Sequence, residues 1–103
     1  MKHFMIRYKR GSGTEAEWHR DIAAFIADLD QDPELKGKIL YRCMKIRGSD
    51  DYFHLAAAAD ETAIKAMQSR DFFKRYTEKT RQVAAGGEVT VSPLDIVAET
   101  GQG

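Results

Sequence analysis

The sequence contains no asparagine and one cysteine, Cys43, among its 103 residues. A single cysteine excludes an internal disulfide and every metal or iron–sulfur site that needs a cluster of thiolates. No apolar run approaches the roughly 20 residues that cross a bilayer, and the N-terminus lacks the apolar core of a secretory signal. We therefore expect a cytoplasmic protein without a membrane partner.

An excess of charge of one sign is also missing, because 16 basic residues balance 16 acidic ones. A chain without net charge has no overall field that would attract nucleic acid or an anionic membrane, so we expect neither as a partner. An RNA-recognition module would also need a basic residue, a glycine and then an aromatic at the start of a strand. Here Arg47 and Gly48 are followed by a serine and two aspartates.

What the sequence does contain is a clear order of hydrophobic periods. Strand-like alternation and helical stripes follow one another at residues 3–9, 18–29, 39–47, 52–58, 64–83 and 89–98, the second and fifth being helical. This order predicts an α+β, ferredoxin-like β-α-β-β-α-β sheet with its helices on one face. A chain of this length supports one core, so we expect a single domain over residues 1–98 and a flexible tail over residues 99–103.

Several side chains predict where helices start. Thr14, followed by Glu17, is placed to form a capping box before the first helix. Asp60 is expected to cap the second helical stretch, and Ser69 is placed as a further cap inside it. We therefore expect that stretch to be broken near Gln68 into a short and a long helix.

The second strand has no polar face. Large apolar side chains lie on both of its sides, for example Leu40 and Met44 on one and Ile39 and Tyr41 on the other. Strands of this kind are usually buried on both sides. Because helices cover only one face of the predicted sheet, the open face must meet water, RNA, a ligand or a second subunit.

His54 is the most informative titratable residue, because it lies in the middle of the third strand beside Tyr52. Small residues follow on the same side, so His54 could exchange protons in a pocket floored by Ala56 and Ala58. The alternative is a hydrogen-bonded histidine in the core or at an interface. Tyr8, Tyr41 and Tyr76 could also place their hydroxyls in a cavity, although tyrosine is common in half-buried strands and helices.

Trp18, Phe72 and Phe73 lie at helical spacing on the predicted helices. Such spacing is typical of core packing. The alternative is that these side chains form the wall of a pocket. Glu15 and His19 are spaced i, i+4 on the first helix, as two metal ligands can be. No third ligand follows at a recognisable spacing, however. A solvated ion pair explains these two residues better, and we expect no metal.

A further group of residues carries a family resemblance. It comprises Asp60, Ala63 and Ile64 at the start of the second helical stretch, Ser69 and Phe72 in its longer part, and Gly86-Gly87, Val89, Val91 and Leu94-Asp95-Ile96-Val97 near the end. Together with the order of elements, they resemble the antibiotic-biosynthesis-monooxygenase group of dimeric α+β-barrel proteins. The resemblance implies a homodimer whose two sheets pack together, with a cavity between sheet and helices in each subunit.

Members of that group oxidise phenolic, anthrone or quinol-type aromatics with molecular oxygen, often without metal or flavin, so the resemblance implies no cofactor. The family often has a glutamate and a tryptophan late in the third strand and a histidine before the serine of the second helix. This sequence has Ala56, Ala58 and Met67 at those places. A haem-degrading branch relies on asparagine, so the resemblance does not extend to haem degradation. Whether the chain is an enzyme stays open.

The resulting hypothesis is a cofactor-independent monooxygenase that acts on a small aromatic molecule. In this hypothesis His54 accepts a proton, while Tyr52 and Tyr76 orient the substrate. The expected wall of the pocket comprises Trp18, Ala56, Ala58, Met67, Phe72 and Phe73, the last of which would stack on the substrate ring. The alternatives are an isomerase or cyclase using the same pocket, a non-catalytic small-molecule-binding or stress-related protein, and an interaction module without a ligand.

Overall fold

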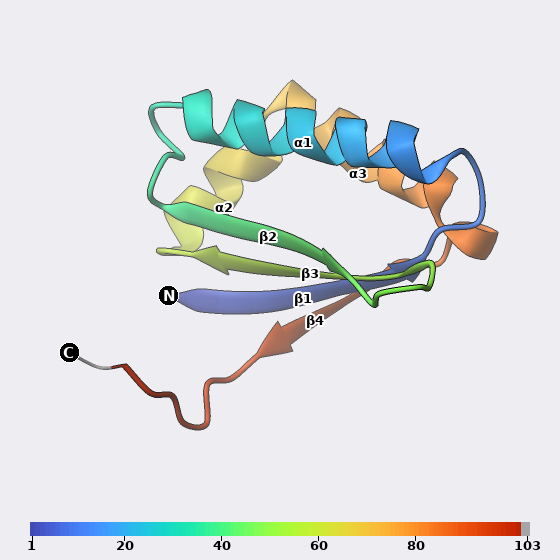
Figure 1. Ribbon diagram of the computed structural model, residues 1–103. Helices are drawn as coiled ribbons and strands as arrows, with labels where there is room; N and C mark the ends of the chain where they lie inside the picture. Colours follow the sequence, from blue (N-terminus) through green and yellow to red (C-terminus); the bar gives the residue numbers. More distant parts are fainter. Residues whose placement is uncertain (102–103) are drawn as a thin grey trace.

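A computed structural model that describes residues 1–101 shows a four-stranded antiparallel sheet with helices on one face (Figure 1). In chain order the elements are β1 (Lys2–Lys9), α1 (Glu15–Gln31), β2 (Ile39–Lys45), β3 (Asp51–Ala58), α2 (Glu61–Gln68), α3 (Asp71–Val83), the 3-10 turn η1 (Ala85–Gly87) and β4 (Thr90–Leu94). The strand order is β2-β3-β1-β4, so β1 and β3 are the central strands. The predicted α+β, ferredoxin-like fold is confirmed.

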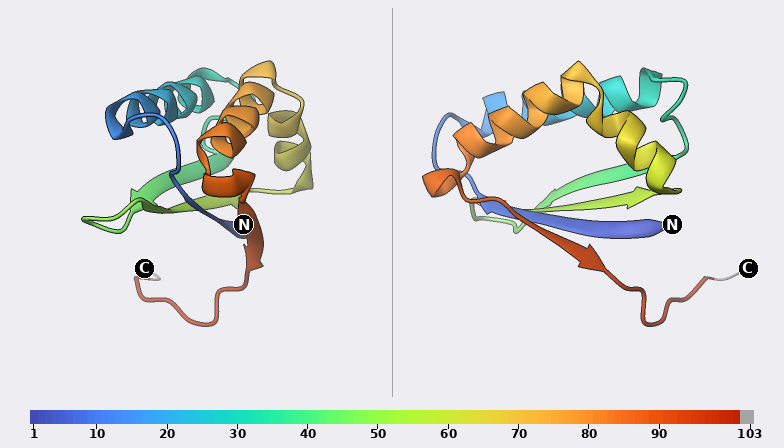
Figure 2. Two further views of the ribbon diagram at one scale, coloured as in Figure 1. Left: turned by 90° about the vertical axis from the view of Figure 1, so that its right-hand side faces the viewer. Right: turned by 180° about the vertical axis from the view of Figure 1, so that it is seen from behind.

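The molecule has two layers, which Figure 2 shows from the side and from behind. The helices α1, α2 and α3 all lie on one side of the sheet, and the segment after β4 runs on the other side. Any internal cavity must therefore lie between the sheet and the helices, while the opposite face of the sheet is bare in a single chain.

The start of α1 follows from its first residues. The backbone N–H of Glu17 donates to the Thr14 hydroxyl at 3.2 Å, and that hydroxyl donates to the Glu17 carboxylate at 2.9 Å. The first bond is the predicted cap, whereas the second joins the two side chains in place of the bond from the Thr14 N–H to the Glu17 carboxylate that completes a capping box. Four turns of apolar residues then face the sheet, at Trp18, Phe25 and other positions of the predicted stripe. The prediction of the first helix is confirmed.

The predicted break in the second helical stretch is also confirmed, since α2 ends at Gln68 and α3 begins at Asp71. Asp60 caps α2 by accepting the backbone N–H of Ala63 at 2.8 Å. The prediction that Ser69 caps the longer helix is wrong, because its hydroxyl instead donates backwards to the Ala66 carbonyl at 2.6 Å. Serine makes such backward bonds readily at helix ends.

The junction between α2 and α3 is held by an ion pair. The Arg70 guanidinium, which directly precedes α3, lies 2.7 Å from the Asp32 carboxylate and 3.2 Å from that of Glu34. Arg70 therefore ties the junction to the connection between α1 and β2. Since the Asp32 side chain is largely buried, this pair is less screened than an ordinary surface pair. Arg70 itself makes no side-chain cap to α3.

The last strand is shorter than predicted, ending at Leu94 rather than at residue 98. Leu94 pairs with His3, almost at the start of β1, so the chain beyond it has no strand left to pair with. Pro93 lies in this edge strand, as its missing N–H requires. Gln102 and Gly103, in the predicted tail, lie outside the described residues, and the domain limit at residue 98 stays a prediction.

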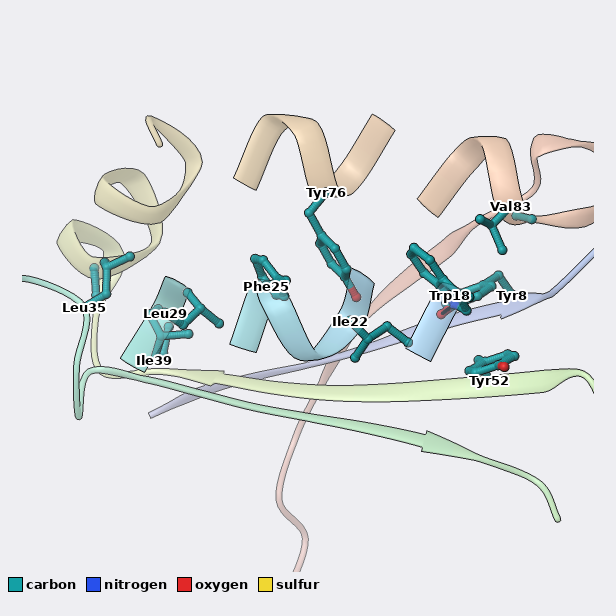
Figure 3. Close-up of a cluster of buried hydrophobic side chains, with 13 residues drawn as sticks. Tyr8, Trp18, Ile22, Phe25, Leu29, Leu35, Ile39, Tyr52, Tyr76 and Val83 are labelled. Carbon is teal, nitrogen blue, oxygen red and sulfur yellow. Dashed lines mark hydrogen bonds between the residues drawn. The ribbon is translucent and has the colours of Figure 1, made fainter. Parts of the chain in front are cut away.

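The core fills the space between the helices and the sheet (Figure 3). Its largest members are Tyr8, Trp18, Ile22, Phe25, Leu29, Leu35, Ile39, Tyr52, Tyr76 and Val83. Three of these are tyrosines and one is tryptophan, so the core contains polar ring atoms that need hydrogen-bond partners away from water. The aromatic part of the core therefore becomes the place to look for a site.

The bare face of the sheet exposes large apolar side chains. Leu40 is 53 % exposed, Met44 39 % and Leu55 38 %. The sequence predicted that β2 is buried on both sides. Within one chain, β2 is covered by helices on one side only, and its other side is exposed. An apolar sheet face of this kind usually marks an interaction surface.

The caps provide a test of the helix assignments. We expect Asp60→Ala to lower the free energy of unfolding by about 1 kcal/mol, because the substitution leaves the Ala63 N–H of α2 without its acceptor. Ser69→Ala should change it by less than about 0.5 kcal/mol, since Ser69 caps nothing. Urea denaturation followed by circular dichroism, at one fixed protein concentration, measures both. Equal losses for the two variants would contradict this account of the break.

Candidate functional site

A cavity of about 340 Å³ lies between the sheet and the pair of helices α2 and α3. Its sheet side is formed mainly by Phe4, Ile6, Ile39, Tyr41, His54, Ala56 and Ala58, and its helix side by Ile64, Met67, Phe73, Tyr76, Thr77, Thr80 and Arg81. The lining is predominantly apolar. Its volume falls at the lower end of the range for small-molecule sites, about 300–1,000 Å³.

The cavity arises from small residues in a central strand. Ala56 of β3 lies opposite Phe4 of β1 and Tyr41 of β2, so a methyl group stands between two aromatic side chains. Ala58 follows two residues later on the same face. The break between α2 and α3 lets α2 depart from the line of α3, as Figure 1 shows. Short side chains below and diverging helices above leave space that larger residues would fill.

His54 lies at the inner end of this cavity and is fully buried. Its Nε2 lies 2.8 Å from the Tyr8 hydroxyl. Its Nδ1 lies 3.1 Å from the Tyr76 hydroxyl and 3.3 Å from that of Tyr41. Trp18 completes the group, because its Nε1–H donates to the Tyr8 hydroxyl at 2.8 Å. Residues from β1, β2, β3, α1 and α3 thus meet at one imidazole.

The partners of Tyr8 fix the tautomer of His54. The Tyr8 oxygen already accepts from Trp18, and within the described part of the chain Nε2 is the acceptor that its own proton can reach. Tyr8 therefore donates to Nε2, and the ring proton of the neutral imidazole is on Nδ1. Nδ1–H then donates toward Tyr76 and Tyr41, which act as acceptors.

This arrangement leaves the hydroxyl protons of Tyr41 and Tyr76 uncommitted to His54. The Tyr41 and Tyr76 hydroxyls also hydrogen-bond each other, and Tyr76 contacts the Cys43 thiol, so at most one of the two protons remains for an acceptor in the cavity. The deep end of the cavity is therefore a hydrogen-bond donor, suited to a carbonyl, phenolate or enolate oxygen of a ligand.

Burial controls the charge state of the group. It lowers the pKa of His54 to about 4, so the imidazole is neutral at physiological pH. Burial likewise raises the pKa values of Tyr41 and Tyr76 above the usual range, so both hydroxyls keep their protons. A neutral imidazole and protonated tyrosines are the species that the hydrogen-bond pattern requires.

Six of the nine residues predicted for the site line the cavity. They are His54, Tyr76, Ala56, Ala58, Met67 and Phe73. Trp18 does not line it, although it was expected in the wall. Its ring is buried in the core, stacked on Tyr76 with 5.8 Å between ring centroids. Trp18 contacts the site through Tyr8 and Tyr76.

Tyr52 and Phe72 also lie outside the cavity lining. The Tyr52 hydroxyl lies 2.8 Å from Nε2 of His19, at the end of the sheet near the start of α1. Tyr52 lies two residues before His54 in β3, so the two side chains share a face of the sheet, but Tyr52 lies farther from the cavity. Phe72 packs against Phe25 and lines a second hollow between α1 and α3.

The sequence offered Tyr8 and Tyr41 as tyrosines whose hydroxyls could enter a cavity, but it did not predict their contacts with His54 or the place of Arg81 in the lining. Tyr8 and Tyr41 are diagonal neighbours of His54 on the two strands that flank β3. The alternating patterns assigned each tyrosine to one face of its strand but not to the helix side, and their meeting at His54 depends on the strand order. Arg81 brings a formal charge to the cavity lining, and its guanidinium lies 3.2 Å from the exposed Glu78 carboxylate. Such exposed pairs are weak.

Residues 1–101 contain no cluster of three or more histidine, cysteine or acidic side chains that could hold a metal ion. The predicted pair Glu15 and His19 is 4.0 Å apart, and Lys45 lies closer to Glu15, at 3.0 Å. The three residues form a partly exposed ionic group. No helix in the described part of the chain is long and apolar enough to cross a membrane.

No family model matches this chain, and no curated protein matches it. Solved structures do. SnoaB, a cofactor-independent oxygenase from Streptomyces nogalater, is 16% identical with a TM-score of 0.74, over 95% of this chain and 94% of that one. A candidate antibiotic biosynthesis monooxygenase from Caulobacter crescentus CB15 is 20% identical with a TM-score of 0.76, over 94% and 90% of the two chains.

A dimeric ferredoxin-like protein of unknown function from Jannaschia sp. CCS1 is 19% identical with a TM-score of 0.65, over 93% of this chain and all of the other (100%). At such identities the likeness establishes the fold. The chain has the fold of antibiotic-biosynthesis-monooxygenase-like proteins, as its sequence predicted.

The buried imidazole makes a prediction for stability against pH. Because the folded state holds His54 neutral down to a pKa of about 4, the unfolded chain, with the ordinary value of 6.5, binds the proton first on acidification. Stability should therefore fall as the pH drops from about 6.5 to about 4. The shift corresponds to about 3 kcal/mol.

His54→Gln should remove this part of the pH dependence, and His3→Gln, on the opposite face of the sheet, should retain it. Urea denaturation at a series of pH values measures the difference between the variants. Acidification also costs stability at Glu15 and Asp32, whose pKa values are lowered by Lys45 and Arg70. All three proteins share that loss. Parallel curves for wild type and His54→Gln would contradict a neutral buried imidazole.

Proposed function

We propose that this protein is a cofactor-independent monooxygenase that acts on a small aromatic molecule of phenol, quinol or anthrone type. The observation that carries the proposal is the cavity, which is apolar along its length and presents tyrosine hydroxyl donors at its inner end. A flat aromatic body fits the apolar walls, and its oxygen meets the donors. The fold shared with SnoaB, a cofactor-independent oxygenase, supports the same class of reaction.

The donors act on the ionised form of the ligand. An aryloxide or enolate placed beside Tyr76 and Tyr41 receives a charge-assisted hydrogen bond, which contributes about 1.5–3 kcal/mol. Loss of water from the apolar cavity works in the opposite direction, because it disfavours the anion. A charge-assisted bond from the remaining tyrosine hydroxyl proton offsets part of that cost. The cavity thereby favours a ligand anion that transfers an electron to molecular oxygen.

The reaction balances without a bound reductant. For an anthrone-type methylene, loss of a proton to water as the ligand binds gives the anion, one-electron transfer to oxygen gives a radical pair, and recombination gives a peroxide at that carbon. Protonation and loss of water leave a carbonyl. Overall CH₂ and O₂ become C=O and H₂O, so four electrons leave the carbon and one oxygen atom is incorporated. The protein supplies position, exclusion of water and stabilisation of charge.

His54 serves this site as a positioning residue. Its Nε2 is occupied by Tyr8, its Nδ1 carries the proton, and burial makes it a weak base. A role in holding Tyr76 and Tyr41 therefore replaces the direct proton transfer that the sequence suggested. Phe73 keeps its predicted role beside the ligand ring, and Tyr41 takes the orienting role once assigned to Tyr52.

Binding without turnover is the second candidate function. The cavity contains no carboxylate, and its imidazole is a weak base, so proton removal from a poorly acidic ligand has no strong acceptor. The same observation disfavours an isomerase or cyclase, which depends on repeated proton transfer. Oxygen uptake separates the two remaining functions, since only the monooxygenase consumes oxygen in proportion to ligand.

The protein acts as a homodimer in this proposal, with the bare faces of two sheets packed together. Leu40, Met44 and Leu55 supply apolar area at the face, and a dimeric ferredoxin-like protein shares the fold. The cavity lies on the opposite face of the sheet, so dimerisation leaves it open. The expected cytoplasmic location stays a prediction.

Tyr76→Phe tests the catalytic part of the proposal. Removing one donor from a charge-stabilising site typically lowers kcat by about 100-fold or more, and we expect a loss of this size with ligand affinity changed only several-fold. An oxygen electrode with a panel of anthrones and quinols measures turnover, and calorimetry measures binding. Binding without oxygen uptake in the wild-type protein would favour the non-catalytic candidate. Equal uptake by wild type and Tyr76→Phe would overturn the proposed role of the hydroxyl.

Leu55→Glu tests the dimer. Leu55 lies on the central strand β3, on the bare face, so a carboxylate there would be desolvated between two copies. We expect light scattering to give a dimer for the wild type and a monomer for the variant. Glu88→Gln, an exposed change outside the sheet, serves as the control and should remain dimeric. A wild-type monomer at micromolar concentration would refute the shared interface.

A further inference from the structure

A continuous row of redox-active rings runs from the cavity to the far end of the core (Figure 3). Tyr76, in the cavity wall, stacks on Trp18 with 5.8 Å between centroids and 7° between planes. Trp18 meets Tyr8 edge-on at 6.1 Å. Tyr8 stacks on Tyr52 at 5.1 Å, with 2° between the planes. Each ring is therefore in contact with the next, which is the arrangement that short-range electron transfer requires.

All three of these tyrosines have a histidine nitrogen at the hydroxyl, but the nitrogen that faces Tyr76, Nδ1 of His54, already carries the ring proton. The Tyr8 hydroxyl donates to Nε2 of His54 at 2.8 Å, and the Tyr52 hydroxyl lies 2.8 Å from Nε2 of His19. A phenol that loses an electron becomes a strong acid and must release its proton at once. Even an imidazole with a pKa of about 4 accepts a proton from so strong an acid. A histidine at hydrogen-bond distance therefore makes oxidation of the tyrosine easier.

We propose that Tyr8 is a one-electron redox site that reduces oxygen-derived radicals formed in the cavity. The inference rests on the proposed function, because the oxidant is the peroxyl radical that forms when a ligand radical escapes recombination, its superoxide partner leaves the cavity, and the radical combines with a second molecule of oxygen. Tyr8 lies away from the cavity lining and is buried, so its radical is shielded from ligand and solvent alike. The unpaired electron is thereby held on Tyr8, away from the cavity in which oxygen reacts.

The transfer balances in atoms and electrons. The O–H bond of Tyr76 breaks, and its hydrogen atom forms the O–H bond of a hydroperoxide, which leaves a Tyr76 radical. That radical gains an electron from Tyr8 through Trp18 and a proton from Nδ1 of His54. The proton of Tyr8 moves to Nε2. The peroxyl radical is thus reduced by one electron, Tyr8 is oxidised by one, and His54 ends as its other neutral tautomer.

The Tyr8 radical is reduced again through the far end of the row. Tyr52 stacks on Tyr8, and the side chain of its partner His19 is 46% exposed. An external one-electron reductant, such as a low-molecular-weight thiol, delivers an electron through Tyr52 and releases its own proton to solvent. Tyr8 recovers the proton from Nε2, and Nδ1 is reprotonated from the cavity through the Tyr76 hydroxyl. The thiol becomes a thiyl radical, and the row returns to its starting state.

The experiment uses the full-length protein with no aromatic ligand. Flash photolysis of tris(bipyridine)ruthenium(II) with a cobalt(III) ammine quencher oxidises the protein, and rapid freezing traps the product for electron paramagnetic resonance. We expect a neutral tyrosyl radical in the wild type and the loss of most of its signal in Tyr8→Phe. Trp18→Phe should slow its formation. Tyr41→Phe removes a hydroxyl that also contacts His54 but lies outside the row, and it should retain the signal.

A second measurement avoids dependence on the folding of Tyr8→Phe. In protein labelled with nitrogen-15 histidine, the trapped radical should show a nitrogen coupling from an imidazole, and His19→Gln should preserve that coupling. A radical without the coupling, or one that disappears in Tyr41→Phe and persists in Tyr8→Phe, would overturn the proposal. Neither result depends on turnover, so failure here leaves the oxygen-uptake test of the proposed function unaffected, and the converse also holds.

Discussion

The hydrogen bonds of one buried imidazole organise the functional half of this molecule. A neutral histidine without solvent contact must have partners at both ring nitrogens, because an unmet donor or acceptor there costs about 1–3 kcal/mol. His54 has Tyr8 on one nitrogen and Tyr76 with Tyr41 on the other. These bonds connect β3 to both neighbouring strands and to α3. They also decide that the cavity receives hydroxyl donors.

The cavity itself results from a balance between that polar cluster and the small residues beside it. Ala56 and Ala58 continue the strand from His54, and neither fills the space below α2. The Arg70–Asp32 ion pair holds the junction where α2 departs from α3. A larger side chain at 56 or 58 would gain apolar burial, on the order of 0.8 kcal/mol per methylene, and close the cavity. The residues present forgo that stabilisation and keep the space open.

Local signals in the sequence predicted the elements well, because their causes are local. Thr14 and Asp60 cap the helices that follow them, and each needs only the next three residues to do so. Ser69 shows the limit of this reasoning, since the same hydroxyl can bond forward to an N–H or backward to a carbonyl. Here Arg70, whose partner Asp32 is 38 residues away, also donates to the Ser69 oxygen at 3.3 Å. Sequence patterns contain no information about that contact.

The candidate site was predictable only as far as its residues share one strand. Alternation along β3 placed His54, Ala56 and Ala58 on one face, and all three line the cavity. Tyr8 and Tyr41 belong to other strands, and their approach to His54 follows from the order β2-β3-β1-β4 together with its register. The same alternation put Tyr52 on the correct face but could not fix its distance along the strand. The face of a strand on which a side chain lies follows from local alternation, whereas its distance from side chains of other strands depends on the fold.

The direction of the hydrogen bonds has the larger consequence for chemistry. A carboxylate at position 54 would accept protons from both tyrosines and leave the cavity without a free donor. The imidazole accepts from Tyr8 and donates from Nδ1, which turns the hydroxyls of Tyr41 and Tyr76 toward acceptors in the cavity. Trp18 sets this direction, because its N–H occupies the Tyr8 oxygen and commits the Tyr8 proton to Nε2. An indole on α1 that does not line the cavity thus determines which nitrogen of His54 carries the ring proton.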